Sequence, residues 1–275
     1  MLGFFTLSRI IKIETYTNIH GIKYFREGEV EGIETQKANF SIVAFTRRGS
    51  GRDQNEDACG IGGILLFGKD TNSGQKLVKL SQLPFLVTLA DGLGGHSSGD
   101  IASRTAIKHL NDIFKSSRGE FKIDEAISDV HHHIRELEEG SSGPYAMGTT
   151  IVGAVINEEL CTIFNVGDSR AYWVHDAGIN QVSEDDVYPG ERTGILTQCL
   201  GGGNPVAPKP HFIQQDIRSG DILVLVSDGI TDAIPDDVIK SVVSERSPEC
   251  SFNLCEEANR LGGSDDASAI ICKFS

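Results

Sequence analysis

Short apolar runs, separated by polar and glycine-containing segments, follow one another along most of this chain. Runs of about four to eight residues rich in β-branched side chains are typical of strands. In two central segments apolar residues recur instead at helical spacing, as Ala102, Ala106 and Leu110 do, and two C-terminal segments are helix-like. The pattern predicts strands at residues 39–46, 61–67, 85–90, 151–156, 160–166, 170–175, 211–216, 222–226 and 267–274, and helices at 98–114, 123–137, 235–243 and 252–261.

The order of these elements predicts an α+β protein. Strands flank the helices without the regular strand–helix–strand alternation of a doubly wound sheet, so we expect a sandwich. At 275 residues the chain is long enough for one large domain with a well-buried core, which we place at residues 39–275. We interpret residues 1–38, which show no sustained period, as an N-terminal extension of unknown role, either an appendage or an extra pair of strands.

Two of the predicted strands end in the same dipeptide. The run 85–90 leads into Asp91-Gly92, and the run 222–226 leads through a serine into Asp228-Gly229. A single Asp-Gly usually forms only a turn, because both residues favour turns for local reasons. Further carboxylates stand at comparable places, namely Asp168 after the run 160–166, the pair Glu56-Asp57 and the pair Asp265-Asp266.

Carboxylates that converge at the edge of a core repel one another and take up protons unless a cation lies among them. Hard oxygen ligands of this kind suit Mg²⁺ or Mn²⁺, and both cations accept the same donors. The strand-end carboxylates therefore predict a divalent metal centre, without deciding between the two metals.

Composition and charge narrow the possible partners. The chain has 25 Lys and Arg against 39 Asp and Glu, a formal net charge of −14, which argues against binding to a nucleic-acid backbone. Its six cysteines form no Cys-x-x-Cys pair and no zinc-like spacing, as expected of thiols in a reducing compartment. The N-terminal apolar patches are too short for a membrane span and resemble no secretory signal. We expect a cytoplasmic monomer that binds no membrane.

Six short motifs contain or flank these carboxylates, in the order Arg52-x-x-x-Glu56-Asp57, Asp91-Gly92-x-Gly94-Gly95-His96, Gly148-Thr149-Thr150, Gly167-Asp168-Ser169-Arg170, Ser227-Asp228-Gly229 and Asp265-Asp266. Their identity, order and spacing resemble those of the metal-dependent serine/threonine protein phosphatases of the PPM (type 2C) family. The resemblance covers about residues 40–275, and the second motif is similar to the bacterial branch. Any one motif is weak evidence, whereas six in order are strong.

The resemblance implies a four-layer α/β/β/α sandwich, in which two antiparallel sheets are flanked by helix pairs and two Mg²⁺ or Mn²⁺ ions lie at one end. It implies that Asp91 bridges the two ions and that the Gly92 carbonyl binds one of them. Asp228 and Asp265 are then expected to complete the site of the other ion.

The same resemblance implies that Glu56 and Asp57 act largely through metal-bound waters and that Asp168 helps to hold a third, weaker ion. Mg²⁺ keeps several waters, and water between two such cations ionises near neutral pH. Arg52 is expected to bind the substrate phosphate, since its guanidinium fork suits that anion. A hydroxide bridging the two metals would then attack phosphorus without a covalent intermediate.

The expected function is hydrolysis of phosphoserine and phosphothreonine in phosphorylated proteins. Two alternatives stay open: a catalytically silent relative that binds a phosphoprotein, and a phosphatase of small phosphate esters. The intact Asp91, Gly92, Asp228 and Asp265 argue against the first, because inactive members typically lose metal ligands. The shape of the pocket, rather than the motifs, distinguishes the second. Neither the physiological substrate nor the opposing kinase follows from the motifs.

One departure from the family pattern concerns the last motif. Asp265-Asp266 stands where relatives commonly have Asp-Asn. Asp265 is the aligned ligand, but a shift of one residue would make Asp266 the ligand instead.

Histidines and the flap are the other departures. The position that carries a catalytic-acid histidine in some members is Leu93 here, so we expect a structural role for His96. Residues 131–133 are three consecutive histidines, which point about 100° apart on a helix and are expected at the surface rather than around one ion. The segment 175–203 resembles by position the flap beside the active site, where we expect substrate choice to lie.

Overall fold

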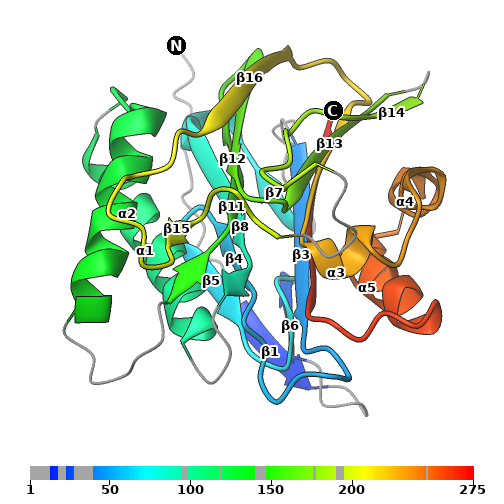
Figure 1. Ribbon diagram of the computed structural model, residues 1–275. Coiled ribbons are helices and arrows are strands. Elements are labelled where there is room, and N and C mark those ends of the chain that lie inside the picture. The colour runs from blue at the N-terminus through cyan, green and yellow to red at the C-terminus, as the bar shows by residue number, and fades with distance from the viewer. Residues whose placement is uncertain are drawn as a thin grey trace, which may run out of the picture.

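Two large β-sheets lie face to face between two layers of helices in the computed structural model of this chain (Figure 1). The structure describes residues 13–17, 23–27, 40–93, 98–117, 119–139, 147–175, 178–189, 195–245 and 247–275. The predicted four-layer α/β/β/α sandwich is confirmed.

The first sheet has the strand order β1-β2-β6-β3-β18-β17-β13-β14, and β7 pairs with β3. Its neighbours are antiparallel, except that β2 and β6 meet in parallel at Lys23↔Thr71. Its strands are β1 (Ile13–Thr17), β2 (Lys23–Glu27), β3 (Phe40–Arg47), β6 (Asp70–Asn72), β7 (Lys76–Val78), β13 (Arg170–His175), β14 (Gly178–Gln181), β17 (Ile222–Val226) and β18 (Ala267–Phe274).

The second sheet is antiparallel throughout, with the order β16-β12-β11-β8-β4-β5. Three very short strands form a small third sheet in the order β15-β10-β9. The bounds are β4 (Ala58–Ile61), β5 (Ile64–Phe67), β8 (Phe85–Ala90), β11 (Ile151–Ile156), β12 (Leu160–Val166) and β16 (His211–Asp216) in the second sheet, and β9 (Gly92–Leu93), β10 (Gly148–Thr149) and β15 (Leu200–Gly201) in the third.

Helices cover the outer face of each large sheet. Those on the second sheet are long, and those on the first are shorter (Figure 1). No helix in the described ranges is long and apolar enough to cross a membrane. The helices are α1 (Gly99–Ser116) and α2 (Ile123–Glu139) on the second sheet, α3 (Asp228–Thr231), α4 (Asp236–Ser244) and α5 (Cys250–Arg260) on the first, and the 3-10 helix η1 (Leu80–Gln82).

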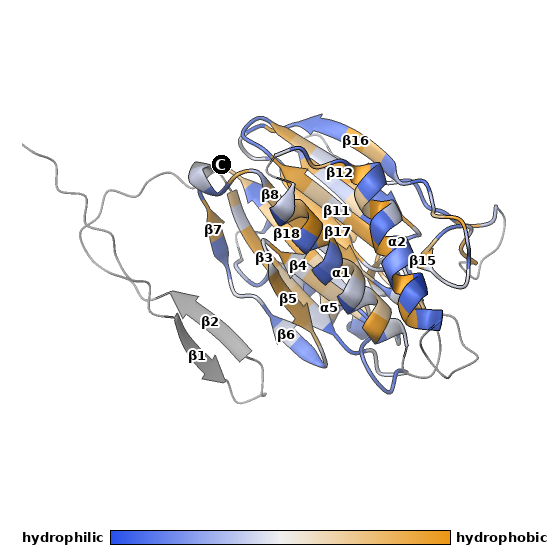
Figure 2. Cartoon of the chain, turned by 90° about the vertical axis from the view of Figure 1, so that its left-hand side faces the viewer, coloured by the Kyte–Doolittle hydropathy of each residue, from blue (hydrophilic) through white to orange (hydrophobic). Residues whose placement is uncertain are grey.

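Three apolar layers hold the four layers of the fold together. Because successive strand residues point to opposite faces, Ile42 and Ala44 of β3 face the other sheet, whereas Val43 and Phe45 face the helices α3 to α5. A third apolar layer lies beneath α1 and α2, and Figure 2 shows orange strands behind helices whose exposed sides are largely blue. Both faces of each central strand are therefore buried, which accounts for the nearly continuous apolar runs of the sequence.

The predicted elements differ from the structure mainly in the short strands. The predicted strand 61–67 is a hairpin of β4 and β5, turned by Gly62 and Gly63 with φ angles of 54° and 94°. The stretch between the predicted strands 61–67 and 85–90 contains β6 and β7, and β14 and β15 lie within 175–203. Strands of two to four residues carry too few apolar positions to produce a pattern.

The N-terminal extension lies mostly outside the described residues. Of it the structure describes β1 and β2, which pair with each other. The domain boundary at residue 39 stays a prediction.

Phe45 provides a test of the packing between the first sheet and α5. Its side chain is fully buried, and its ring meets that of Phe252 edge to face at 5.1 Å between centroids. We expect Phe45→Ala to lower the free energy of unfolding by about 3–5 kcal/mol, because it leaves a cavity. In urea unfolding, the control Phe212→Ala, at a residue that is 60% exposed, should change it by less than about 0.5 kcal/mol. Equal losses for the two variants would contradict this packing.

Candidate metal centre

Antiparallel pairing in the second sheet brings two of the predicted ligands together. The first residue of β4 pairs with the last residue of β8, Ala58 with Ala90. Asp57 directly precedes β4 and Asp91 directly follows β8, so the two carboxylates leave the sheet at the same end. Their pairing depends on strand direction, which no local sequence pattern specifies.

The first sheet delivers its carboxylates to the same end. The last residue of β17, Val226, pairs with Ala269 near the start of β18. Asp228 follows β17, while Asp265 and Asp266 precede β18, so all three lie at one edge. The hydroxyl of Ser227, the residue after β17, donates to Oδ2 of Asp57 at 2.8 Å, so the edges of the two sheets meet.

The threonine motif at 148–150 fixes the backbone of Asp91. The Thr150 N–H and the Thr149 hydroxyl both donate to the Asp91 carbonyl, each at 2.8 Å. The Asp91 N–H donates to the Thr150 hydroxyl oxygen at 3.1 Å, and that oxygen lies 2.8 Å from the Ser169 hydroxyl. The third and fourth motifs therefore support the turn that carries Asp91.

Two glycines allow the N-terminus of α1 to approach this turn. A Cβ on Gly92 would lie 2.2 Å from the Gly99 carbonyl oxygen, and one on Gly99 would lie 2.8 Å from the Glu56 carboxyl carbon. The Gly92 N–H also donates to the Glu56 carbonyl at 3.2 Å. Glycine is therefore required here by close contact, which places Glu56 beside the turn.

Asp57 carries the clearest sign that something is to be bound here. It is 1% exposed, and its Oδ2 accepts from the Ser227 hydroxyl at 2.8 Å. Its Oδ1 is buried and has no hydrogen-bond partner. A buried oxygen without a donor is costly, and a cation or its bound water would satisfy it.

The carboxylates here are held in unfavourable surroundings. Burial, strengthened by repulsion from Asp266, raises the pKa of Asp57 to about 8. Burial raises the pKa of Asp91 far above its usual range, and repulsion from Asp57 and Asp228 adds to this. Burial likewise raises the pKa of Asp228. Positive charge among these groups would reverse the repulsion, so the residues fit a divalent cation.

Asp168 belongs to the same electrostatic cluster. Burial raises its pKa to about 7, with Asp228 as the next cause. Asp168 is partly buried and follows Gly167, whose φ of 98° forms the turn after β12. Its carboxylate therefore lies at the margin of the cluster, and its role toward a third ion stays a prediction.

Asp265 and Asp266 are separated by their partners. Asp266 is 3% exposed and both of its oxygens accept backbone N–H groups, from Gly49 and Glu56, at 2.8 Å each. Asp265 is more exposed and accepts a forked pair of bonds from Arg52, at 2.6 and 2.5 Å. Both oxygens of Asp266 are engaged by backbone N–H groups, whereas Oδ2 of Asp265 accepts from the exposed Arg52 side chain, so Asp265 is the better candidate ligand.

Arg52 lies at the open rim of the cluster, with its side chain 45% exposed. The ion pair with Asp265 raises the pKa of its guanidinium, which stays charged. The fork that grips Asp265 also matches a phosphate group.

Within the described residues, no three acidic, histidine or cysteine side chains form a ready cage around one ion. Mg²⁺ normally keeps several waters and takes few direct protein ligands, so such a cage is not required. The arrangement can bind cations through a few carboxylates and their waters.

A sequence model of the protein phosphatase 2C family matches residues 70–258 of this chain. The chain belongs to the protein phosphatase 2C family. Membership places it among the protein phosphatases, so that prediction is confirmed. It is similar to the serine/threonine phosphatase stp of Listeria monocytogenes, with 27% identity over 251 residues that cover 82% of this chain and 92% of the relative.

Solved structures agree with this assignment. The chain is similar to the serine/threonine phosphatase PstP of Mycobacterium tuberculosis, with 25% identity and a TM-score of 0.69 over 86% of this chain and 99% of that structure. It is also similar, with a TM-score of 0.67, 25% identity and coverage of 85% and 98%, to the PstP catalytic domain in complex with two manganese ions. The resemblance to the bacterial branch of the phosphatases is thereby confirmed.

Some residues of the phosphatase lie elsewhere than the sequence suggested. The prediction of a surface position is wrong for His131, which is fully buried. Its Nδ1 accepts from the Gly201 N–H at 3.1 Å, and its Nε2 lies 3.1 Å from the Asn204 carbonyl. With 100° between successive residues, one histidine of three faces the core. His96 lies outside the described residues.

Sequence reasoning missed the residues that hydrogen-bond to the acidic residues of the cluster or to the backbone beside them. Ser227, which binds Asp57, gave no signal beyond its place in the Ser-Asp-Gly motif. Asp186 is 6% exposed and donates to and accepts from the Gly167 backbone. Such partners are distant in sequence, so only their positions in the fold identify them.

The pKa of Asp57 predicts how the metal-free phosphatase responds to pH. The folded state binds the proton more tightly than the unfolded state, whose pKa is near 3.8, so this stability is complete below that value and is lost as pH rises through about 8. We expect the melting temperature of metal-free protein to fall between about pH 5 and about pH 8. Asp57→Asn, which cannot ionise, should lose part of that fall, whereas the exposed control Asp216→Asn should keep it.

Added Mn²⁺ should raise the wild-type melting temperature by several degrees at the upper end of this range, and less in Asp57→Asn. A metal-free melting temperature that rises with pH, or equal Mn²⁺ effects in both proteins, would contradict this assignment.

Proposed function

We propose that the chain hydrolyses phosphoserine and phosphothreonine in phosphorylated proteins, using two Mg²⁺ or Mn²⁺ ions. The observation that carries the proposal is the cluster of buried, mutually repelling carboxylates at one end of both sheets, with the unpartnered Oδ1 of Asp57 in it. Two relatives support it by their descriptions: the stp proteins are named serine/threonine phosphatases, and the PstP catalytic domain binds two manganese ions.

The proposed ligands divide by their surroundings. Asp91 is assigned to bridge the two cations, because next to burial the carboxylates of both sheets, Asp57 and Asp228, raise its pKa most. The Gly92 carbonyl is assigned to one ion, and Asp228 and Asp265 are assigned to the other. Cations held there would supply a bridging hydroxide as nucleophile and neutralise charge on the phosphoryl group.

Glu56, Asp57 and Asp168 complete the proposed set. Glu56 lies against Gly99 and its pKa is raised by burial, and Asp57 is buried behind Ser227. Both are assigned to hold metal-bound waters. Asp168, at the margin of the cluster, is assigned to a third and weaker ion.

Arg52 is assigned to bind the substrate phosphate. It is the exposed cation of the rim, and it carries two parallel donors now directed at Asp265. A phosphate that enters beside Asp265 meets the same donors, so Arg52 exchanges one anion for the other.

Monomeric state, cytoplasmic location and the assignment of residues 39–275 to the phosphatase domain belong to the same proposal. They rest on the composition and motif span of the sequence.

Hydrolysis of para-nitrophenyl phosphate and of a phosphothreonine peptide tests the proposal. With Mn²⁺ or Mg²⁺ both substrates should be hydrolysed, and chelation should abolish the activity. Asp228→Asn should lower kcat by at least about 100-fold, since it weakens a metal ligand. Full activity without metal, or an unchanged Asp228→Asn variant, would sink the two-metal mechanism.

The same assay decides between the alternatives. A metal-loaded chain with no activity on either substrate would favour a silent phosphoprotein-binding protein. A strong preference for the small ester would favour a phosphatase of small molecules.

Arg52→Lys keeps the charge but removes the fork. We expect kcat/KM for the phosphothreonine peptide to fall about 10- to 100-fold, the worth of one charge-assisted hydrogen bond. The matched control Arg218→Lys, at an exposed arginine, should leave kcat/KM unchanged. Equal behaviour of the two variants in steady-state kinetics would remove Arg52 from the phosphate site.

A further inference from the structure

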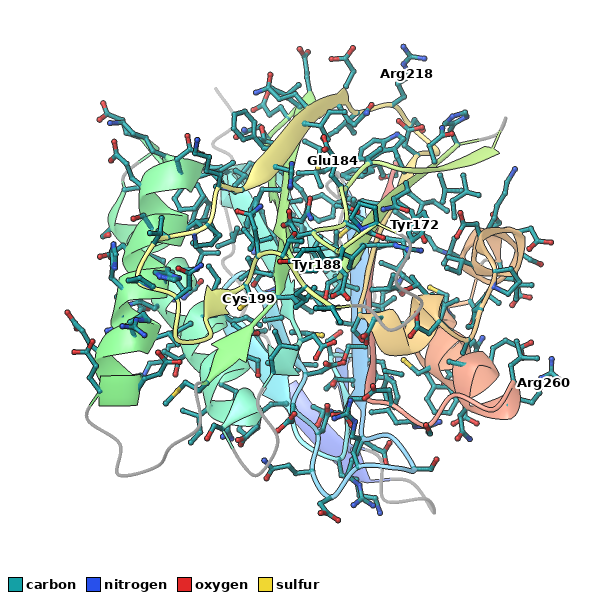
Figure 3. All side chains as sticks on the ribbon, in the orientation of Figure 1. Tyr172, Glu184, Tyr188, Cys199, Arg218 and Arg260 are labelled. Atoms are coloured by element: carbon teal, nitrogen blue, oxygen red, sulfur yellow. The ribbon has the colours of Figure 1, made fainter. Side chains whose placement is uncertain are left out.

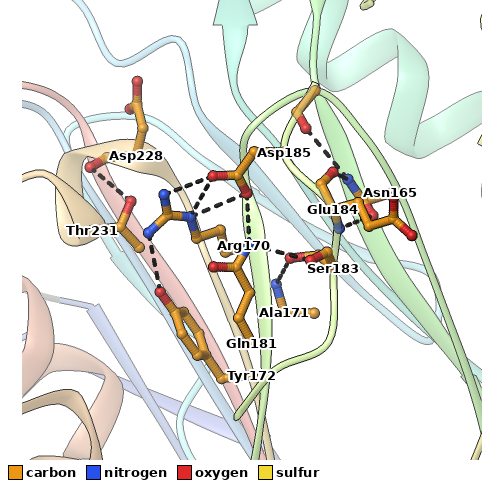
Figure 4. A network of polar contacts seen from close by, with 11 residues as sticks. Asn165, Arg170, Ala171, Tyr172, Gln181, Ser183, Glu184, Asp185, Asp228 and Thr231 are labelled. Carbon is orange, nitrogen blue, oxygen red and sulfur yellow. Dashed lines mark hydrogen bonds and ion pairs between the residues drawn. The ribbon is translucent and has the colours of Figure 1, made fainter. Parts of the chain in front are cut away.

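Three consecutive acidic residues attach the segment after β14 to the turn between β12 and β13. Asn165 of β12 bonds both backbone groups of Glu184, and Arg170 of β13 forms a forked ion pair with Asp185 (Figure 4). In the view of Figure 3, Glu184, Tyr188 and Cys199 lie between the helices on the left and those on the right. The third residue of the run, Asp186, bonds the backbone of the residue that precedes Asp168.

The carboxylate of Asp186 is buried and fully engaged. Its Oδ2 accepts from the Gly167 N–H at 2.9 Å. Its Oδ1 lies 2.9 Å from Nε2 of His211 and accepts from Nε2 of Gln198 at 2.7 Å. The Asp186 N–H also donates to the Gly167 carbonyl at 3.1 Å, so one residue binds both sides of the Gly167 unit.

Gly167 transmits this contact to the cluster of carboxylates. Its φ is 98°, and a Cβ on it would lie 2.7 Å from the Thr150 side chain, so its position is closely restricted. The next residue is Asp168. A displacement of the Gly167 peptide therefore displaces the Asp168 carboxylate.

The hydrogen-bond pattern requires an acceptor on both oxygens of residue 186. The Gln198 Oε1 accepts from the Lys209 N–H at 2.9 Å, which directs the Gln198 NH₂ group at Asp186. The Gly167 N–H is also a donor. An asparagine at 186 would present its own NH₂ to one of these two donors, whichever way its amide is turned.

We propose that Asp186 is a positioning residue that holds the Gly167–Asp168 turn to Gln198 and His211 and thereby sets where the Asp168 carboxylate lies. The inference rests on the proposed function for its catalytic consequence, because Asp168 is assigned there to the weakest cation. Removal of a residue that orients a metal ligand typically lowers metal affinity by about 10- to 100-fold.

Asp186→Asn is the first variant. The Gly167 amide should lose protection from hydrogen exchange, measured by ¹H–¹⁵N NMR of the metal-free protein. Calorimetry with Mn²⁺ should show the weakest site weakened about 10-fold, and kcat for para-nitrophenyl phosphate should fall while KM changes little. The exposed control Asp216→Asn should match wild type in all three measurements.

A double variant separates hydrogen bonding from packing. In Asp186→Asn with Gln198→Glu, the new carboxylate at 198 accepts both the Lys209 N–H and the amide at 186, and the amide oxygen accepts the Gly167 N–H. Net charge equals that of wild type. We expect the exchange protection factor of the Gly167 amide and the Mn²⁺ affinity to return to within about threefold of wild type, because the two substitutions compensate each other in a double-mutant cycle.

Several outcomes overturn the inference: an Asp186→Asn variant identical to wild type, or a double variant no better than the single one. If Asp186→Asn does not fold, Gln198→Met removes one donor at a partly exposed position and should lower Gly167 protection less strongly; unchanged protection there refutes the proposal. Wild-type protein without metal-dependent activity would refute the proposed function alone, since the Gly167 exchange measurement does not depend on catalysis.

Discussion

Repulsion among carboxylates buried at one end of the two sheets is the constraint on which the rest of this structure depends. Burial raises the pKa of Asp57, Asp91 and Asp228, and repulsion from neighbouring carboxylates adds to the rise in each case. Such an arrangement is unfavourable by itself and persists because both sheets, packed through one apolar layer, hold their strand ends in place. The stability of the sandwich is therefore what keeps these carboxylates together.

Hydrogen bonds from hydroxyl groups and close backbone contacts at two glycines fix the positions of the acidic residues. Hydroxyl groups of Thr149, Thr150 and Ser227 bind the backbone or carboxylate of the acidic residues from behind, so that the cluster has few ways to relax. Gly92 and Gly99 serve the same end by close approach, because any larger residue would push α1 away from Glu56. Many residues of the six motifs are therefore not proposed ligands themselves but hold the acidic residues in position.

Acidic residues in this phosphatase fall into two groups that the amino-acid type does not distinguish. Asp266 and Asp186 are satisfied by N–H donors of the backbone and side chains, and they hold loops together. Asp57 keeps an oxygen without a donor, and Asp265 faces the open rim with Arg52. A carboxylate held by buried donors is structural, whereas a buried oxygen without a donor, as in Asp57, is satisfied by a cation. Asp265 differs from Asp266 in that its forked donors come from an exposed arginine.

The sequence by itself determined the elements with long apolar runs, such as β8 and β11, whose predicted bounds agree with the structure, and it determined the family through its six ordered motifs. It could not reveal β6 or β15, because two or three residues form no period. It also left Asp265 and Asp266 undecided, and it placed His131 at the surface. Only the tertiary structure shows that Asp266 is engaged by the backbone and that His131 is buried, since their donors come from Gly49 and Gly201, which are 217 and 70 residues away along the chain. Contacts of that range depend on how the sheets and helices pack, and no local pattern of side chains encodes them.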